Sequence, residues 1–308
     1  MTGKVQRIAT LALFLLCAGI CTAQSRPAIF DFHSGFWINL HQFLIHQAAA
    51  AEAAPSDPPE WRDAVSYYRR VVAQHDSMGG VEVVINNRLA AAGSATELPP
   101  DELDPELRAV LSKAAPVYRS LWWPEHNRSN LAWIDAVQPL LAKYGASMCK
   151  DIAAVYQTPW PTAPIRTDVA AFAGTHGAYT TIEPTHITIS STDKGYQGEA
   201  ALEMLFHESS HSLDEKVRAA LEKERAARGV LFKRREFSHA LLFYTAGEIT
   251  RRYLPNYEMY GVRNGIFADG WPESLPVLER EWKPYLDGRV DLTSAVRGLV
   301  TGYGVPTR

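Results

Sequence analysis

Apolar side chains recur every three or four positions through most of the first half of the chain. This spacing places them on one face of a helix, so amphipathic helices are predicted there. Further helices are expected over residues 105–113, 116–122 and 130–157, the last with bends at Pro139 and Gly145. Residues 81–85 fit either a short strand or a turn of helix. The clearest helical positions are Phe36, Leu40, Phe43, Leu44, Trp61, Val65, Tyr68 and Val72.

The pattern changes after a proline-rich stretch at residues 158–164. Three short segments rich in β-branched residues follow, at 165–173, 178–182 and 186–191, and glycine or proline separates them. Segments of this length and composition are typical of strands, and we expect a small antiparallel sheet. In the third segment Ile187 and Ile189 alternate with polar residues, which predicts a half-exposed strand.

Two strong helical patterns follow the sheet, at residues 199–215 and 237–253, and a last one covers 291–300. The expected fold class is therefore α+β: mainly helical, with the small antiparallel sheet before the 199–215 helix. We expect one domain over residues 24–308, with a mostly helical part up to residue 160 and the sheet and its following helices from 161 onward.

Composition and charge agree with a folded globular protein. The chain has 308 residues, 46% of them hydrophobic and 21% charged, and its formal net charge is −3. Basic residues form no long run, so a nucleic-acid partner is not expected. No apolar run reaches about 18 residues, so we expect no membrane span in the mature chain.

The first residues have the pattern of a secretory signal. Lys4 and Arg7 precede an apolar run at residues 8–20, and small residues lead to a cleavage site near Ala23. The mature protein is therefore expected to be secreted or periplasmic. Two of the three cysteines leave with this segment, so Cys149 remains without a partner for an internal disulfide, and we expect it in a helix core.

Inside the 199–215 helix stands an H-E-x-x-H motif formed by His207, Glu208 and His211. On a helix that turns about 100° per residue, the two histidines lie one turn apart and point the same way. Both imidazoles can then bind one Zn²⁺ ion, with Glu208 close enough to reach a metal-bound water. The alternative is a secreted helical binding protein in which the motif occurs by chance and the two histidines bind no metal. The apolar flank of this helix argues against that alternative.

The motif and the strand–loop–helix order before it resemble the zincin metallopeptidases. The resemblance implies a Zn²⁺ cofactor and a peptide or protein substrate, hydrolysed by a zinc-bound water that Glu208 activates. A zincin-like protein without peptidase activity, which binds a partner or acts on another amide or ester, is the alternative function. The resemblance also implies that residues 186–191 are the edge strand that pairs with the substrate.

A third zinc ligand must come from downstream. The glycine and third histidine that metzincins carry just after the motif are absent, whereas the gluzincin branch uses a glutamate on a second helix. That resemblance points to Glu248 in the 237–253 helix, where a mainly apolar setting requires a partner for the carboxylate. His239 and Asp214 are the rivals, and His239 faces the opposite side of its helix from Glu248. Asp214 or Glu203 is otherwise expected to hydrogen-bond a ligand imidazole.

The zincin reaction also needs a hydrogen-bond donor for the developing negative charge. Tyr257 and Tyr260 are the leading candidates, because they occupy a loop-like stretch soon after the 237–253 helix. Tyr244 and His176 are further candidates.

Overall fold

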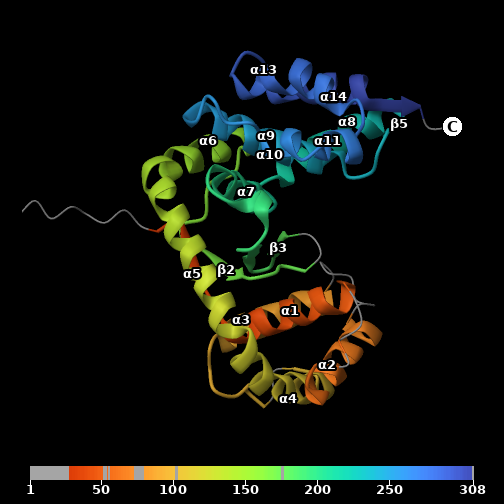
Figure 1. Ribbon diagram of the computed structural model, residues 1–308. Coiled ribbons are helices and arrows are strands. Elements are labelled where there is room, and N and C mark those ends of the chain that lie inside the picture. The colour runs from red at the N-terminus through yellow and green to blue at the C-terminus, as the bar shows by residue number, and fades with distance from the viewer. Residues whose placement is uncertain are drawn as a thin grey trace, which may run out of the picture.

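The structure, a computed structural model, describes residues 28–50, 54, 56–72, 80–100, 103–174 and 177–306. The predicted signal segment and His176 lie outside the described residues. Helices make up most of the fold, and a four-stranded sheet lies near its middle (Figure 1). The elements that build the first half and the sheet are β1 (Phe30–His33), α1 (Phe36–Ala50), α2 (Pro59–Arg70), α3 (Gly80–Ala92), α4 (Pro105–Leu121), α5 (Trp123–Leu140), α6 (Ala146–Tyr156), β2 (Ile165–Ala170), β3 (Ala178–Ile182) and β4 (Thr185–Ser190).

The second half is helical apart from a two-stranded ribbon that joins β5 to β6. Two of its helices, α7 and α9, pack against each other and carry the residues of interest. The elements are α7 (Glu199–Ser210), α8 (Glu215–Arg228), β5 (Val230–Phe232), α9 (Phe237–Tyr253), α10 (Tyr260–Arg263), α11 (Ile266–Gly270), α12 (Ser274–Val277), α13 (Lys283–Leu286), α14 (Leu292–Tyr303) and β6 (Gly304–Pro306). Single turns of 3-10 and π-helix occur at Lys194–Tyr196, Leu141–Gly145 and Leu278–Trp282.

The central sheet has the strand order β1-β2-β4-β3, and it is mixed rather than antiparallel as expected. β1 runs parallel to β2 and β2 parallel to β4, while β3 pairs antiparallel with β4. The antiparallel expectation held only for the β3–β4 hairpin. β1 was not predicted at all, because four residues directly before a helix give little periodic signal.

The strand order also corrects the expectation that residues 186–191 form the sheet edge. β4 lies between β2 and β3, so β3 is the edge strand on this side of the sheet. Both faces of β4 are buried: Ile187 and Ile189 enter one core, and His186, Thr188 and Ser190 are also buried. A strand with neighbours on both sides and helices over both faces has no exposed side.

Helix positions follow the predicted periodicity closely. The inward positions Trp61, Val65 and Tyr68 of α2 are all buried, and α9 begins and ends where expected. Residues 81–85 belong to α3, and the two helices expected around Pro116 are one continuous helix, α4. The bends foreseen in residues 130–157 correspond to the π-helical turn that joins α5 to α6.

The buried apolar residues form two cores, one on each side of the sheet region. One core joins α1, α2, α3 and α4. The other joins the strands to α5, α6 and the helices after β4, and it includes the buried Cys149. Figure 1 shows α1–α4 on one side of β2 and β3, α7 and the later helices on the other, and α5 alongside both. The boundary foreseen near residue 160 therefore does not follow the cores, because β1, α5 and α6 join the second one.

The expected α+β class is confirmed: the protein is mainly helical and has one small sheet. None of the helices in the described part of the chain combines the length and apolarity needed to cross a bilayer.

Candidate metal centre

Helix α7 carries the H-E-x-x-H motif and is buried along its whole length from Ala200 to Ser210. Its apolar flank enters the second core, as the sequence predicted. The helix ends earlier than expected, at Ser210, and the chain turns before α8 begins at Glu215. His211 follows directly in right-handed helical conformation, so it keeps the one-turn relation to His207, and the two ring centroids lie 5.2 Å apart.

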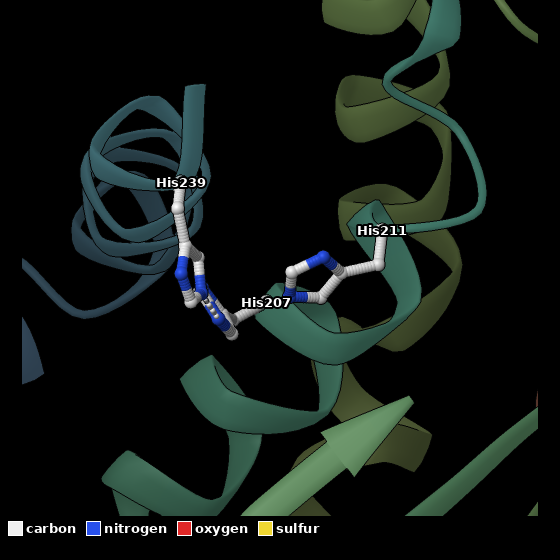
Figure 2. A group of neighbouring side chains, drawn as sticks. All are labelled: His207, His211 and His239. Carbon is white, nitrogen blue, oxygen red and sulfur yellow. Dashed lines mark hydrogen bonds between the residues drawn. The ribbon is translucent and has the colours of Figure 1, made fainter. Parts of the chain in front are cut away.

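A third histidine comes from the first turns of α9. The Nε2 atom of His239 lies 3.2 Å from Nε2 of His207. One nitrogen from each of His207, His211 and His239 fits within a group no wider than 4.8 Å. Figure 2 shows the rings of His239 and His207 meeting between the two helices, with the His211 ring turned toward them. Three imidazoles from two packed helices therefore converge on one point.

Glu248 lies outside this group of histidines, and the third member is His239 instead of the predicted Glu248. The Glu248 side chain is 6% exposed, and its carboxylate forms ion pairs with Arg251 at 2.8 Å and Lys283 at 3.1 Å. The sequence correctly indicated that His239 and Glu248 face opposite sides of α9, but not which side packs on α7. A usable signal was present: Arg251, one turn after Glu248, offers that carboxylate a partner other than a metal.

The environment of His207 and His211 keeps these two rings uncharged. Burial, together with the neighbouring His239 and His211 rings, holds the pKa of His207 well below its usual range. Burial, His239 and Arg218 lower the pKa of His211 to about 3. Each imidazole then has a free lone pair at neutral pH, which is the form that binds metal ions.

Glu208 directly follows His207 in α7, and it is 3% exposed. Its Oε2 atom accepts a hydrogen bond of 2.7 Å from the Thr180 hydroxyl on β3. Burial raises the pKa of Glu208 to about 7, and the bond from Thr180 opposes the rise. A carboxyl group whose pKa lies near neutrality can both accept and return a proton. The sequence gave no sign of Thr180, because nothing in its neighbourhood distinguishes it.

Aromatic rings fix the imidazoles from one side. Phe243 stacks on His207 with ring centroids 3.9 Å apart, and Trp271 meets the edge of His239 at 5.6 Å. The ring of Tyr260 stacks on Phe243 in turn, at 6.1 Å. Such packing restricts ring rotation and so holds the nitrogens in place.

The two tyrosines proposed from sequence have different surroundings. Tyr257 is buried, and burial together with the Glu203 carboxylate raises its pKa above the usual range. Tyr260 is half-buried near the histidines, and its hydroxyl shares a hydrogen bond with that of Tyr196. Tyr196, which the sequence reading missed, lies close enough to Glu208 for that carboxylate to raise its pKa further, after burial.

The carboxylates expected to orient the imidazoles have other partners. Glu203 accepts the backbone N–H of Tyr260 at 2.9 Å, and Asp214 accepts from Arg218 at 2.8 Å. The buried Nδ1 atom of His207 has no hydrogen-bond partner within the described part of the chain. The nearby backbone of Leu242 only partly offsets the burial that lowers the pKa of this ring.

Comparison of this chain with protein-family models, with curated proteins and with solved structures finds no match. The site therefore has to be interpreted from its own geometry.

Proposed function

We propose that the protein is a secreted zinc-dependent hydrolase that cleaves peptides. The observation that carries this proposal is the convergence of His207, His211 and His239 on one point, with the buried Glu208 as the residue that follows His207 in α7. The N-terminal signal pattern supports secretion, and the resemblance of the motif to zincins supports peptide hydrolysis.

The donor set fits Zn²⁺. Nitrogen ligands at about 2.0–2.1 Å from a tetrahedral zinc ion lie about 3.3 Å apart. The two Nε2 atoms of His207 and His239 are separated by 3.2 Å, which matches this spacing. The whole group of three nitrogens is up to 4.8 Å wide, so a ring must turn inward for all three to bind one ion. The three imidazoles would hold the ion, and three is the usual number of protein ligands in catalytic zinc sites. When bound, Zn²⁺ supplies a Lewis acid and makes its coordinated water acidic near neutral pH.

Glu208 provides the general base. Its carboxylate takes a proton from the attacking water and delivers it to the leaving amine. Its pKa of about 7, which burial produces, suits both steps. Tyr260 is the better placed of the two tyrosines to donate to the carbonyl oxygen, because it packs on Phe243, which itself stacks on His207.

The strand next to Glu208 supports a peptide as substrate. β3 is the outermost strand of its sheet, and it carries Thr180, which contacts the Glu208 side chain. An extended peptide can add to such an edge through main-chain hydrogen bonds. This role now belongs to β3 rather than to residues 186–191.

Zinc binding by matched variants of α9 tests the proposal. His239→Ala removes a proposed ligand, and Glu248→Gln removes a carboxylate that pairs only with Arg251 and Lys283 among its described ion pairs. Zinc affinity of the purified mature protein, measured by competition with a chelator, should fall by more than about 100-fold in His239→Ala, because losing a ligand exceeds losing an outer-shell partner. It should be unchanged in Glu248→Gln.

If Glu248→Gln loses zinc affinity and His239→Ala keeps it, Glu248 is the third ligand and His239 is not. Absence of zinc binding in the wild type would end the proposal. If zinc binds but labelled casein is not cleaved, the metal site stands and the peptidase activity does not.

A further inference from the structure

The hydrogen bond from Thr180 to Glu208 joins the edge strand to the motif helix. The Thr180 hydroxyl lies 2.7 Å from Oε2 of Glu208 and 3.0 Å from its backbone carbonyl oxygen. Within the described part of the chain, it is the one side-chain donor resolved at the Glu208 carboxylate. The carboxylate is therefore oriented by a residue of a different element from the one that carries it.

The donor itself is rigid. Threonine is β-branched, which restricts its side-chain rotation, and Thr180 is paired with Ile187 of β4 in the sheet. A glutamate side chain, by contrast, has three rotatable bonds, so a buried Glu208 without this donor has no fixed carboxylate direction. Loss of the donor also leaves a buried acceptor unsatisfied, which favours rotation toward another partner.

The neighbouring residue ties the strand to the helices beneath it. The hydroxyl of Tyr179 donates to the side chain of Asn86 on α3 at 2.8 Å and accepts from Gln42 on α1 at 2.7 Å. Because successive residues of a strand point to opposite faces, Tyr179 anchors β3 on one face while Thr180 holds Glu208 on the other. The position of the donor is thus set by the first core of the protein.

We propose that Thr180 is a positioning residue that holds the Glu208 carboxylate in its working orientation and so sets the rate of the catalytic step. The inference rests on the proposed hydrolase function. Among its described hydrogen bonds, the Thr180 hydroxyl contacts only Glu208, so its effect is expected to pass through that residue.

Kinetics of three variants test the proposal in the zinc-loaded mature protein, with fluorescein-labelled casein as the probe. Thr180→Val should lower kcat by about 10- to 100-fold, the range seen when outer-shell partners are removed, and leave KM and zinc affinity unchanged. Thr180→Ser keeps the hydroxyl and should restore most of the rate. Thr185→Val is the matched control, because its hydroxyl bonds only the carbonyl of Ile182, at 3.4 Å, among its described side-chain contacts.

A double variant separates positioning from general damage. If Thr180 acts through Glu208, adding Thr180→Val to Glu208→Gln should cause no further loss of rate. An additive loss, an unchanged kcat in Thr180→Val, or a loss of zinc in that variant would each overturn the proposal.

Crystal structures of the zinc-loaded proteins give a readout that does not depend on activity. Glu208 should point to the same place in the wild type and in Thr180→Ser, and turn away in Thr180→Val. An unmoved carboxylate in Thr180→Val would overturn the positioning role even if no casein is cleaved. Failure of the wild type to cleave casein, by contrast, counts only against the proposed function.

Discussion

Two clusters of side chains in this protein surround their histidine ring nitrogens in different ways. His186 lies between Asp168, whose carboxylate is 2.8 Å from Nε2, and Asn87, whose side-chain oxygen is 3.0 Å from Nδ1. In the candidate metal centre, Nε2 of His207 faces Nε2 of His239 instead. The first histidine has oxygen acceptors on both sides, whereas the second meets another nitrogen.

We interpret the difference as that between a structural histidine and a proposed ligand. His186 has a side-chain oxygen at each ring nitrogen, and it ties β4 to β2 and α3. Two imidazole nitrogens that face each other can share at most one proton, so this pair gains less from its contact. A cation that accepts all the lone pairs resolves the arrangement. Substitutions around His186 should therefore lower the free energy of unfolding. Substitutions in the candidate metal centre should instead change zinc binding or turnover.

The largest expected effect is on turnover, and it tests the candidate metal centre. Glu208→Gln removes the proposed base and keeps the volume of the side chain and all three imidazoles. Turnover of labelled casein should fall by about 10²- to 10⁴-fold, the usual contribution of a general base. Zinc content and the midpoint of urea unfolding should stay near the wild-type values. Near-normal turnover would remove Glu208 from the mechanism.

The next effect concerns the structural cluster. Asp168 is fully buried and binds Arg166 at 2.7 Å as well as His186. Asp168→Asn removes the carboxylate charge from both partners, and the free energy of unfolding should fall by about 3 kcal/mol, the low end for a buried pair because Arg166 is partly exposed. Urea unfolding measures the loss. Zinc bound per folded molecule should not change, and a loss of zinc would break the distinction between the clusters.

The smallest effect is a pH dependence of the zinc-free protein. Burial, His239 and Arg218 lower the pKa of His211 to about 3 in the folded state, against 6.5 in the unfolded chain. The unfolded state therefore binds more protons below pH 6.5, and stability is lost as the pH falls from 6.5 toward 3. The slope from this residue reaches about 1.4 kcal/mol per pH unit.

Urea unfolding in the presence of a chelator at pH 7, 6 and 5 measures this slope. The free energy of unfolding should depend less steeply on pH in His211→Gln than in the wild type, because one titrating group has been removed. Parallel curves for the two proteins would show that His211 does not titrate with this depressed pKa.

The sequence predicted the two helices of the site well, because their periodicity is a local property. α9 has the predicted bounds, and the spacing of His207 and His211 alone placed both rings on one face. The third member of the group depends on how α9 is rotated against α7, and local periodicity does not fix that rotation. Glu248 was preferred because an acidic residue in an apolar helix needs a partner, and Arg251 and Lys283 are that partner.

The sheet was predicted less well for the same reason. The strands after residue 164 were found from their composition, but their neighbours were not, since β1 comes from the far N-terminal end of the described chain. Thr180 likewise acquires its contact with Glu208 only when the hairpin packs on α7. Pairings between distant segments are set by the whole fold and leave no trace in either segment alone.

The pairing of β1 with β2 has a consequence for the order of folding. Phe30 pairs with Ile165, so all of α1 to α6 lies in the loop that this contact closes. Closing a long loop costs chain entropy before the contact contributes any stabilisation. Proteins whose contacts join distant residues therefore fold slowly. The core of α1–α4 uses residues that are much nearer in sequence. The buried residues of this helical core all precede Ile165 in the chain, so during synthesis they emerge while β1 still lacks its partner strand.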